Sequence, residues 1–322
     1  METTANNAGF NRPKAFKIFF VVLLGIFLLG LLYWLIFSRN SEFTDDAYVA
    51  GSQIQVVSQI EGAIATVNAS ETQAVEEGQT LFRIDPTEVM IASEKADIDL
   101  RNADADYQKR KALQGDASVS KEELEHSQLA LLKAMANARQ AYINLLRVDV
   151  QSPAKATVAK RYAQVGQRVA PGTQLALMVA GDQIWVDANF KEDQLKHIRI
   201  GQPAKLESDI YGGKMEFHGK VVGFAPGTGS TLALLPPQNA TGNWVKVVQR
   251  LPVRIELDAN ELSKNPLNIG LSMNVKVDTS NRDGSPLQAM DKGPIIDTTI
   301  YQKQFDKAER HIQALLSKSK KQ

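Results

Sequence analysis

The residues that most often carry out chemistry in proteins are few and scattered in this sequence. The chain contains no cysteine, which excludes disulfides, thiolate metal sites and a cysteine nucleophile. Gly227–Gly229 lies in a proline-rich stretch and not between a strand and a helix, so it does not predict a phosphate-binding loop. The chain has four histidines, His126, His197, His218 and His311. No two of them are separated by a spacing typical of metal ligands. The sequence therefore predicts no catalytic residue, no metal site and no cofactor.

The composition is that of a folded protein without a strongly charged partner. Hydrophobic residues make up 43% of the 322 residues and charged residues 23%, which excludes global disorder. The 37 basic and 36 acidic side chains leave a net charge of +1. Nucleic-acid binding requires a concentrated basic face, and this balance does not predict one.

The N-terminal region contains a segment suited to a membrane. Residues 18–37 carry no charge, and a helix of this length is about 30 Å long, the thickness of one hydrocarbon core. The run ends in aromatic residues and lacks a small-x-small cleavage site, which favours a single-pass anchor over a cleaved signal or a buried core helix. Arg12, Lys14 and Lys17 precede it, so the positive-inside rule predicts a cytoplasmic tail over residues 1–17 and the remaining chain outside.

An internal repeat indicates a small β-sandwich made of two halves. Residues 60–85 and 154–179 match at an offset of 94 positions, and each copy combines a β-branched start, a glycine turn and an alternating strand. One copy has a single apolar face and needs its twin to bury it, so we predict one sandwich from residues 58–86 and 152–182. The alternative is that the match is a chance similarity between two β-hairpins. The identical pairs are Ala65/Ala159, Val75/Val169, Gly78/Gly172 and Leu81/Leu175.

The residues between the two copies, 87–150, predict an antiparallel helical hairpin. We expect the first helix to begin with Asp85 as N-cap and Pro86 at its first position, and the second at the capping box Ser120–Glu123. Apolar residues alternate three- and four-residue steps, the period of a coiled coil, although two ordinary core helices are an alternative. The predicted stripes are Val89, Ala96, Leu100, Ala103 and Tyr107, then Leu124, Leu131, Met135, Ala138, Tyr142 and Leu145.

The second half of the chain predicts a β-barrel and a helical tail. Residues 183–280 contain five or six alternating segments separated by glycine and proline, a pattern typical of a small barrel. A strand over residues 45–57 precedes the sandwich and is free to return to the barrel. Residues 281–322 predict a linker and a C-terminal helix, to which the sequence assigns no role. The fold class is mostly β with an α-helical coiled-coil hairpin.

This organisation resembles that of the membrane fusion proteins, or periplasmic adaptors, and is most similar to the EmrA-like branch of the HlyD family. The resemblance covers about residues 40–280 and is strongest in 44–62, 190–209 and 227–257. It implies a lipoyl-like sandwich, an inner-membrane protein with a periplasmic bulk, and a role in multidrug efflux. The implied partners are a drug/proton antiporter of the major facilitator class, a TolC-like outer-membrane channel and further copies of the chain. The hairpin is shorter than the family pattern.

The resemblance also implies a docking site at the tip of the hairpin. Adaptors that dock on TolC-like channels carry an Arg-x3-Leu-x6-Ser-x3-(Leu or acid) motif, which the present sequence matches except for lysine in the arginine position. Ser120 is equally explained as an N-cap, and the two leucines as the closed end of a coiled coil. The residues at these positions are Lys109, with Arg110 beside it, Leu113, Ser120 and Leu124.

A long loop over residues 225–243 interrupts the predicted barrel. It carries Leu232, Leu234 and Leu235 between proline and glycine residues, and exposed apolar loops usually mark an interface. We expect it to contact the antiporter or a neighbouring adaptor, with capping of the barrel as the alternative.

Other classes of function are less consistent with the sequence. In an acyl- or biotin-carrier domain a lysine lies on the turn between the sandwich halves, and here the hairpin replaces that turn. An adaptor of an ATP-driven exporter, or an anchored scaffold, is the remaining alternative. The sequence therefore favours a non-enzymatic adaptor.

Overall fold

The computed structural model describes residues 19–28, 40–113, 119–212, 215–232, 248–288, 290 and 297–319. The chain divides into two compact units, one formed by Met1–Ala50 with Ile184–Gly293 and the other by Gly51–Gln183 with Pro294–Gln322. Residues 19–28 are helical, and the other half of the predicted anchor, 18–37, lies outside the described residues. Among the described segments, no helix has both the length and the apolar character needed to cross a membrane.

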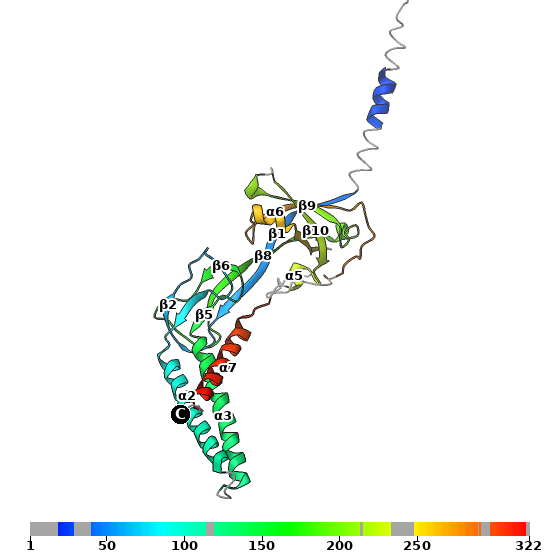
Figure 1. Ribbon diagram of the computed structural model, residues 1–322. Coiled ribbons are helices and arrows are strands. Elements are labelled where there is room, and N and C mark those ends of the chain that lie inside the picture. The colour runs from blue at the N-terminus through cyan, green and yellow to red at the C-terminus, as the bar shows by residue number, and fades with distance from the viewer. Residues whose placement is uncertain are drawn as a thin grey trace, which may run out of the picture. The chain divides into compact units, whose positions relative to one another are not determined.

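In the part of the chain that the structure describes, six strands form a barrel in the first unit, β1 and β8 with only part of their length; Figure 1 shows the barrel. β1 pairs with β12 in antiparallel register from Ser41 opposite Asp278 to Tyr48 opposite Ser272, so the strand that precedes the sandwich also contributes to the barrel. β1 and β8 pair as well, which closes the ring of strands. The order is β1 (Ser41–Val57), β12 (Ser272–Asp278), β9 (Pro203–Ser208), β10 (Glu216–Phe224), β11 (Arg250–Leu257) and β8 (Gln174–Lys191). The short connecting helices are α4 (Glu192–Leu195), η2 (Asp209–Tyr211), α5 (Gly229–Leu232) and α6 (Ala259–Lys264).

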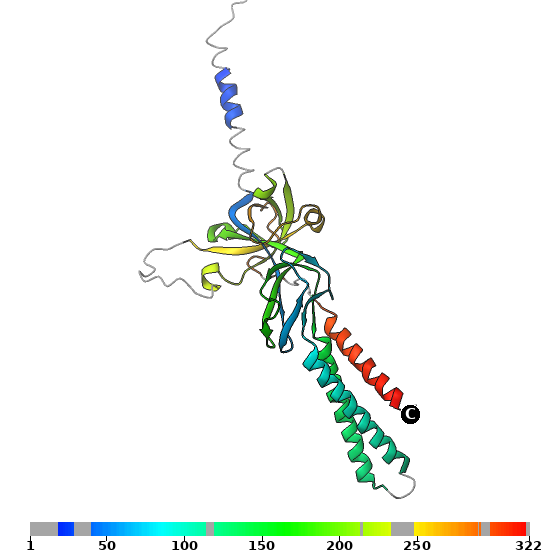
Figure 2. The ribbon, with the colours of Figure 1, turned by 90° about the vertical axis from the view of Figure 1, so that its left-hand side faces the viewer.

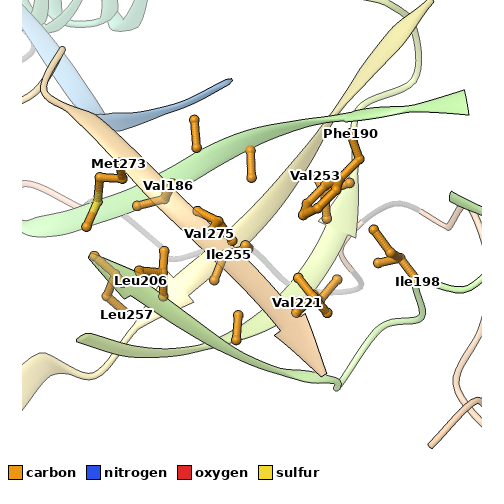
Figure 3. Close-up of a cluster of buried hydrophobic side chains, with 14 of the residues drawn as sticks. Val186, Phe190, Ile198, Leu206, Val221, Val253, Ile255, Leu257, Met273 and Val275 are labelled. Carbon is orange, nitrogen blue, oxygen red and sulfur yellow. The ribbon is translucent and has the colours of Figure 1, made fainter. Parts of the chain in front are cut away.

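The barrel core follows from the alternation seen in the sequence. Along β9, Ala204 and Leu206 are buried while the residues on either side of them are exposed, as expected for side chains that point to opposite faces of a strand. Figure 3 shows Ile255, Val275 and other side chains from different strands meeting in the barrel interior. Burial of each such side chain stabilises the fold by about 1.5–3 kcal/mol.

The second unit contains the predicted sandwich, and the internal repeat is confirmed strand by strand. β2 (Gly62–Val67), β3 (Ala74–Val75) and β4 (Thr80–Ile84) recur 94 positions later as β6 (Ala156–Arg161), β7 (Arg168–Val169) and the start of β8. The short strand β5 (Asp149–Gln151) pairs with β4. The equivalent apolar pairs of the two copies are all buried in one core, namely Ile64/Val158, Val75/Val169, Leu81/Leu175 and Ile84/Met178.

The two copies also repeat their backbone hydrogen bonds. Gly78 and Gly172 have φ of +83° and +89°, in the left-handed region that favours glycine. The amide of Gly78 donates to the carbonyl of Ser152 at 2.9 Å, and the amide of Gly172 donates to the carbonyl of Ser58 at 2.8 Å. Each copy therefore holds the turn of the other, which explains why the sandwich needs both.

Two long helices form the hairpin between the sandwich halves. α2 (Thr87–Ala112) and α3 (Lys121–Leu146) each contain 26 residues, a length of about 39 Å at the α-helical rise. The prediction for the start of α2 was wrong by one residue, because Pro86 occupies the N-cap without a side-chain bond. Asp85 instead accepts hydrogen bonds from the amide and hydroxyl of Thr87, at 3.1 and 2.7 Å, in a turn that precedes the helix.

A third helix, α7 (Ile300–Ser319), packs beside the hairpin, a position that the sequence did not predict. Both views show it running along α2 and α3 and ending short of the hairpin tip (Figures 1 and 2). Ile312 and Leu315 of α7 are buried in one apolar cluster with Leu100 of α2 and Ala138 of α3. The part of the hairpin next to the sandwich is thus a three-helix bundle.

Candidate functional site: the tip of the helical hairpin

The end of α2 presents a basic surface. Lys109, Arg110 and Lys111 occupy its last turn, where positive charge is favourable beside the free carbonyl groups. The Arg110 Nε donates to the Asp106 Oδ2 at 3.0 Å, an i,i+4 ion pair that holds the guanidinium along the helix. Lys109 is exposed. Among the predicted docking residues, Lys109 is therefore free to meet a partner, whereas Arg110 is partly engaged.

The start of α3 is fixed by the predicted capping box, which is confirmed. The Ser120 hydroxyl accepts from the amide of Glu123 at 3.2 Å, and the Glu123 Oε2 accepts from the amide of Ser120 at 3.0 Å. The hydrogen bonds from Ser120 hold the pKa of Glu123 below its usual value, and the charge of Arg110 adds to this effect. Capping thus accounts for Ser120 without a partner, and no contact in the structure tests its docking role.

The two leucines of the predicted motif differ in exposure. Leu113 follows α2 as its C-cap residue and is 38% exposed. Leu124 lies in the first turns of α3 and is half-buried. All five predicted residues lie at the ends of the two helices that meet at the tip. The arrangement offers an apolar side chain between a basic and an acidic helix end, a surface suited to contact with a protein and without catalytic groups.

The predicted loop contact falls almost wholly outside the described residues. Leu234 and Leu235 are not among them. Leu232 is the last residue of α5, and only its backbone is described. The leucines of this loop therefore stay a prediction.

The packing of α7 against the hairpin is the main feature that sequence reasoning missed. The Arg139 Nη2 lies 2.8 Å from the Glu309 Oε2, joining α3 to α7. The His311 Nε2 lies 2.9 Å from the Asp97 Oδ2, and its ring stacks on Tyr142 with centroids 4.0 Å apart. The apolar residues Ala308, Ile312 and Leu315, spaced at three- and four-residue steps, were the available signal that α7 buries one face.

Three of the four histidines, His197, His218 and His311, lie beside carboxylates. His197 lies 2.6 Å from Glu42, and His218 lies 2.8 Å from Glu261. Within the described part of the chain no cluster of three or more histidine, aspartate or glutamate side chains could hold a metal. These three histidines thus serve as hydrogen-bond partners within the fold.

A β-barrel and a two-part β-sandwich split by a helical hairpin are the combination of domains that defines a membrane fusion protein. The family model described as RND MFP, barrel-sandwich hybrid domain, matches residues 52–181. Multidrug export protein EmrA of Escherichia coli (strain K12) is 40% identical over 316 residues, which cover 80% of this chain and 81% of that protein. Fatty acid resistance protein FarA of Neisseria gonorrhoeae is 40% identical over 298 residues, covering 74% and 76% of the two chains.

Solved structures agree on the fold. The MacA–MexA chimeric protein with the Pseudomonas aeruginosa MexA hairpin has a TM-score of 0.61 at 20% identity, over 78% of this chain and 84% of its own. Membrane fusion protein Spr0693 of Streptococcus pneumoniae R6 has a TM-score of 0.58 at 18% identity, over 75% and 99% of the two chains.

The chain belongs to the EmrA-like periplasmic adaptors, the membrane fusion proteins of multidrug efflux. Proteins of this family are structural linkers, so the chain is not an enzyme. The region aligned with Escherichia coli EmrA is 316 residues long but takes up only 80% of this 322-residue chain. Within the aligned region, that relative therefore contains segments that this chain lacks. This is expected if the hairpin of the present chain is the shorter one.

Proposed function

We propose that the chain links an inner-membrane drug/proton antiporter of the major facilitator class to a TolC-like outer-membrane channel, so that drugs leave the cell without entering the periplasm. The observation that carries this is the identity of 40%, over most of both chains, with a protein named for multidrug export. The fold adds a helical hairpin with an exposed tip, the part of an adaptor that can reach a second membrane. The work of transport belongs to the antiporter.

In this proposal residues 18–37 anchor the protein once in the inner membrane. Their lack of charge and the basic residues before them support a cytoplasmic N-terminus and a periplasmic bulk. A periplasm-specific reporter should be active when fused after Gln322 and inactive when fused at Gly9. The reverse pattern would overturn the orientation.

We propose that the channel docks on the tip residues Lys109, Arg110, Leu113, Ser120 and Leu124. We also propose that the antiporter or a neighbouring copy contacts the loop leucines Leu232, Leu234 and Leu235. Exposure of Lys109 and Leu113 supports the first part. Replacing the three loop leucines by serine should weaken co-purification with the antiporter without changing the melting temperature. A large fall in melting temperature would favour barrel capping instead.

The proposed function is tested by drug resistance in cells that lack their own adaptor. Expression of this chain with a fourteen-helix antiporter should restore resistance, and expression with an antiporter but without the hairpin residues 87–150 should not. Affinity purification from the same membranes identifies the transporter by mass spectrometry. Recovery of an ATP-driven exporter in place of an antiporter would instead support the alternative, an adaptor of an ATP-driven secretion system.

A further inference from the structure

A small cavity lies in the second unit, where the first turn of α7 meets the sandwich and the end of α3. It is lined by residues of β1 and β5, by Arg147 after α3, and by the start of α7. Its volume is about 70 Å³. One buried water needs roughly 10–15 Å³, so the cavity has room for a ligand of about five non-hydrogen atoms.

Arg147 brings an unpaired positive charge to this cavity. Its one side-chain hydrogen bond to a described residue is long, from Nη1 to the Asn144 Oδ1 at 3.4 Å. Its Nε is buried and has no hydrogen-bond partner in the described part of the chain. The ion pairs between described residues do not include Arg147. A buried donor on a guanidinium favours a ligand that accepts from it, and the strongest acceptor is an anion.

Gln59 restricts the choice of anion. Its Oε1 lines the same cavity region, is buried, and meets no hydrogen-bond donor among the described residues. This oxygen only accepts hydrogen bonds, so a fully deprotonated anion such as sulfate leaves it unsatisfied. Hydrogen phosphate accepts from the Arg147 Nε through a charged oxygen and donates to Gln59 through its hydroxyl. Its five non-hydrogen atoms also match the room in the cavity.

The start of α7 adds to the preference for an anion. Ile300 and Tyr301, the first two residues of this 20-residue helix, line the cavity. The first turn of α7 contains no acidic side chain, so the partial positive charge of the helix N-terminus is not neutralised from within the helix. Gln151 and Gln304 place side-chain amides in the wall, which can donate to further oxygens of the ligand.

The two carboxylates nearest to these residues are already engaged. Asp149 lines the cavity, and its Oδ1 lies 3.7 Å from the Arg83 Nε. Glu77 accepts hydrogen bonds from Thr299, just before α7, and does not line the cavity. Neither carboxylate therefore supplies the negative charge that Arg147 lacks.

We propose that this cavity binds a small oxyanion that keeps a hydroxyl, namely hydrogen phosphate, between Arg147, Gln59 and the first turn of α7. Such a ligand contacts the end of α3, the segment after β1 and the start of α7 at once. It therefore holds α7 on the base of the hairpin, and the packing of α7 responds to the ligand. This property does not depend on the antiporter or the channel.

The test uses the full chain in a sugar-based detergent, which contains no phosphate, with inorganic phosphate as the probe. Phosphate should raise the melting temperature in a saturable manner, and chloride at the same ionic strength should not. Sulfate should bind about tenfold more weakly, because it cannot donate to Gln59. Amide hydrogen exchange at Ile300 and Tyr301 should slow over the same range of phosphate concentration. Absence of saturable binding would overturn the site, and equal affinity for sulfate would overturn the role of Gln59.

Variants separate this site from general attraction between phosphate and basic side chains. Arg147→Gln should weaken phosphate binding about tenfold or more, and Arg147→Lys, which keeps the charge without the Nε donor, should weaken it less. Gln59→Leu should bind phosphate and sulfate equally. The matched control is Arg168→Gln, which removes one positive charge from the same unit outside the cavity and should bind phosphate as the original does. Undiminished binding in both Arg147 variants, or an equal loss in Arg168→Gln, would identify adventitious binding only and overturn the proposal.

Discussion

The half of the hairpin next to the sandwich and the half that forms the tip are built differently from the same two helices. In the first half α7 packs on α2 and α3, and Leu100 and Ala138 have no exposed surface. At the tip the helices have only each other among the described residues, and Leu113 is exposed. The comparison separates a region whose side chains stabilise the fold from one whose side chains are available to a partner.

The difference arises from the third helix and not from the pattern of the two helices themselves. The stripe of α2 from Leu100 to Tyr107 packs in the cluster that holds Ile312 and Leu315 of α7, whereas Leu113 beyond it is exposed. A two-helix hairpin buries little surface for its length, and a third helix adds apolar burial without lengthening the rod. In a chain with a short hairpin, α7 thus stiffens the base and leaves the tip free.

The largest expected effect lies in the covered half. Leu100→Ala removes a fully buried side chain between three helices and should lower the free energy of unfolding by about 2–5 kcal/mol. Leu132→Ala on the exposed face of α3 is the matched control and should change it by less than about 0.5 kcal/mol. Urea unfolding followed by helical circular dichroism compares the two. Equal losses would mean that the two faces of the hairpin are not distinct in solution.

A smaller effect is expected at the tip, where Ser120 caps α3. Ser120→Ala removes the acceptor for the Glu123 amide and should cost about 1 kcal/mol. Ser120→Asp restores an acceptor and adds a charge that suits a helix N-terminus, so stability should be close to that of the original. If the tip docks on a channel, Ser120→Asp should nevertheless lower drug resistance. Full resistance in Ser120→Asp, Leu113→Ser and Lys109→Glu alike would remove docking from the tip.

Several features of the fold and of the tip could be predicted from the sequence, because local sequence signals determine them. The capping box at Ser120, the repeat that pairs Gly78 with Gly172, and the apolar stripe through Leu100 each depend on neighbouring residues or on one fixed offset. These features follow from helix capping, glycine turns and periodicity. Sequence reasoning therefore found the sandwich, the barrel and the hairpin.

The surface against which α7 packs could not be predicted in the same way. The amphipathic pattern around Ile312 says that one face is buried, but not against which of several apolar surfaces. The contacts that select the hairpin, Glu309 with Arg139 and His311 with Asp97, join residues 170 and 214 positions apart. Such pairings depend on the path of the linker before α7 and not on local spacing.

The ion pair between Arg139 and Glu309 is expected to contribute less than capping does. Its side chains keep about a third of their surface exposed, so water screens much of the attraction. A double-mutant cycle with Arg139→Ala and Glu309→Ala should give a coupling energy of about 0.5–1 kcal/mol. Zero coupling would indicate that apolar burial of Ile312 and Leu315 alone seats α7.

The smallest expected effect is the pH dependence of the junction between α7 and the sandwich. The Glu77 Oε1 accepts hydrogen bonds from the hydroxyl and amide of Thr299, at 2.8 and 3.0 Å, just before α7 begins. These bonds lower the pKa of Glu77 relative to its usual value. A carboxylate with a depressed pKa in the folded state stabilises the fold above its usual pKa, and this contribution is lost as pH falls through the lowered value.

Because Glu77 is exposed, its protonation should loosen the start of α7 without unfolding the bundle. Amide hydrogen exchange at Ile300 and Tyr301 should therefore become relatively less protected as pH falls through the acidic range, after correction for the intrinsic exchange rate. Glu77→Gln should show weaker protection at neutral pH and little further change on acidification. An unchanged acid response in Glu77→Gln would assign the titration to another group and leave α7 held by its buried face alone.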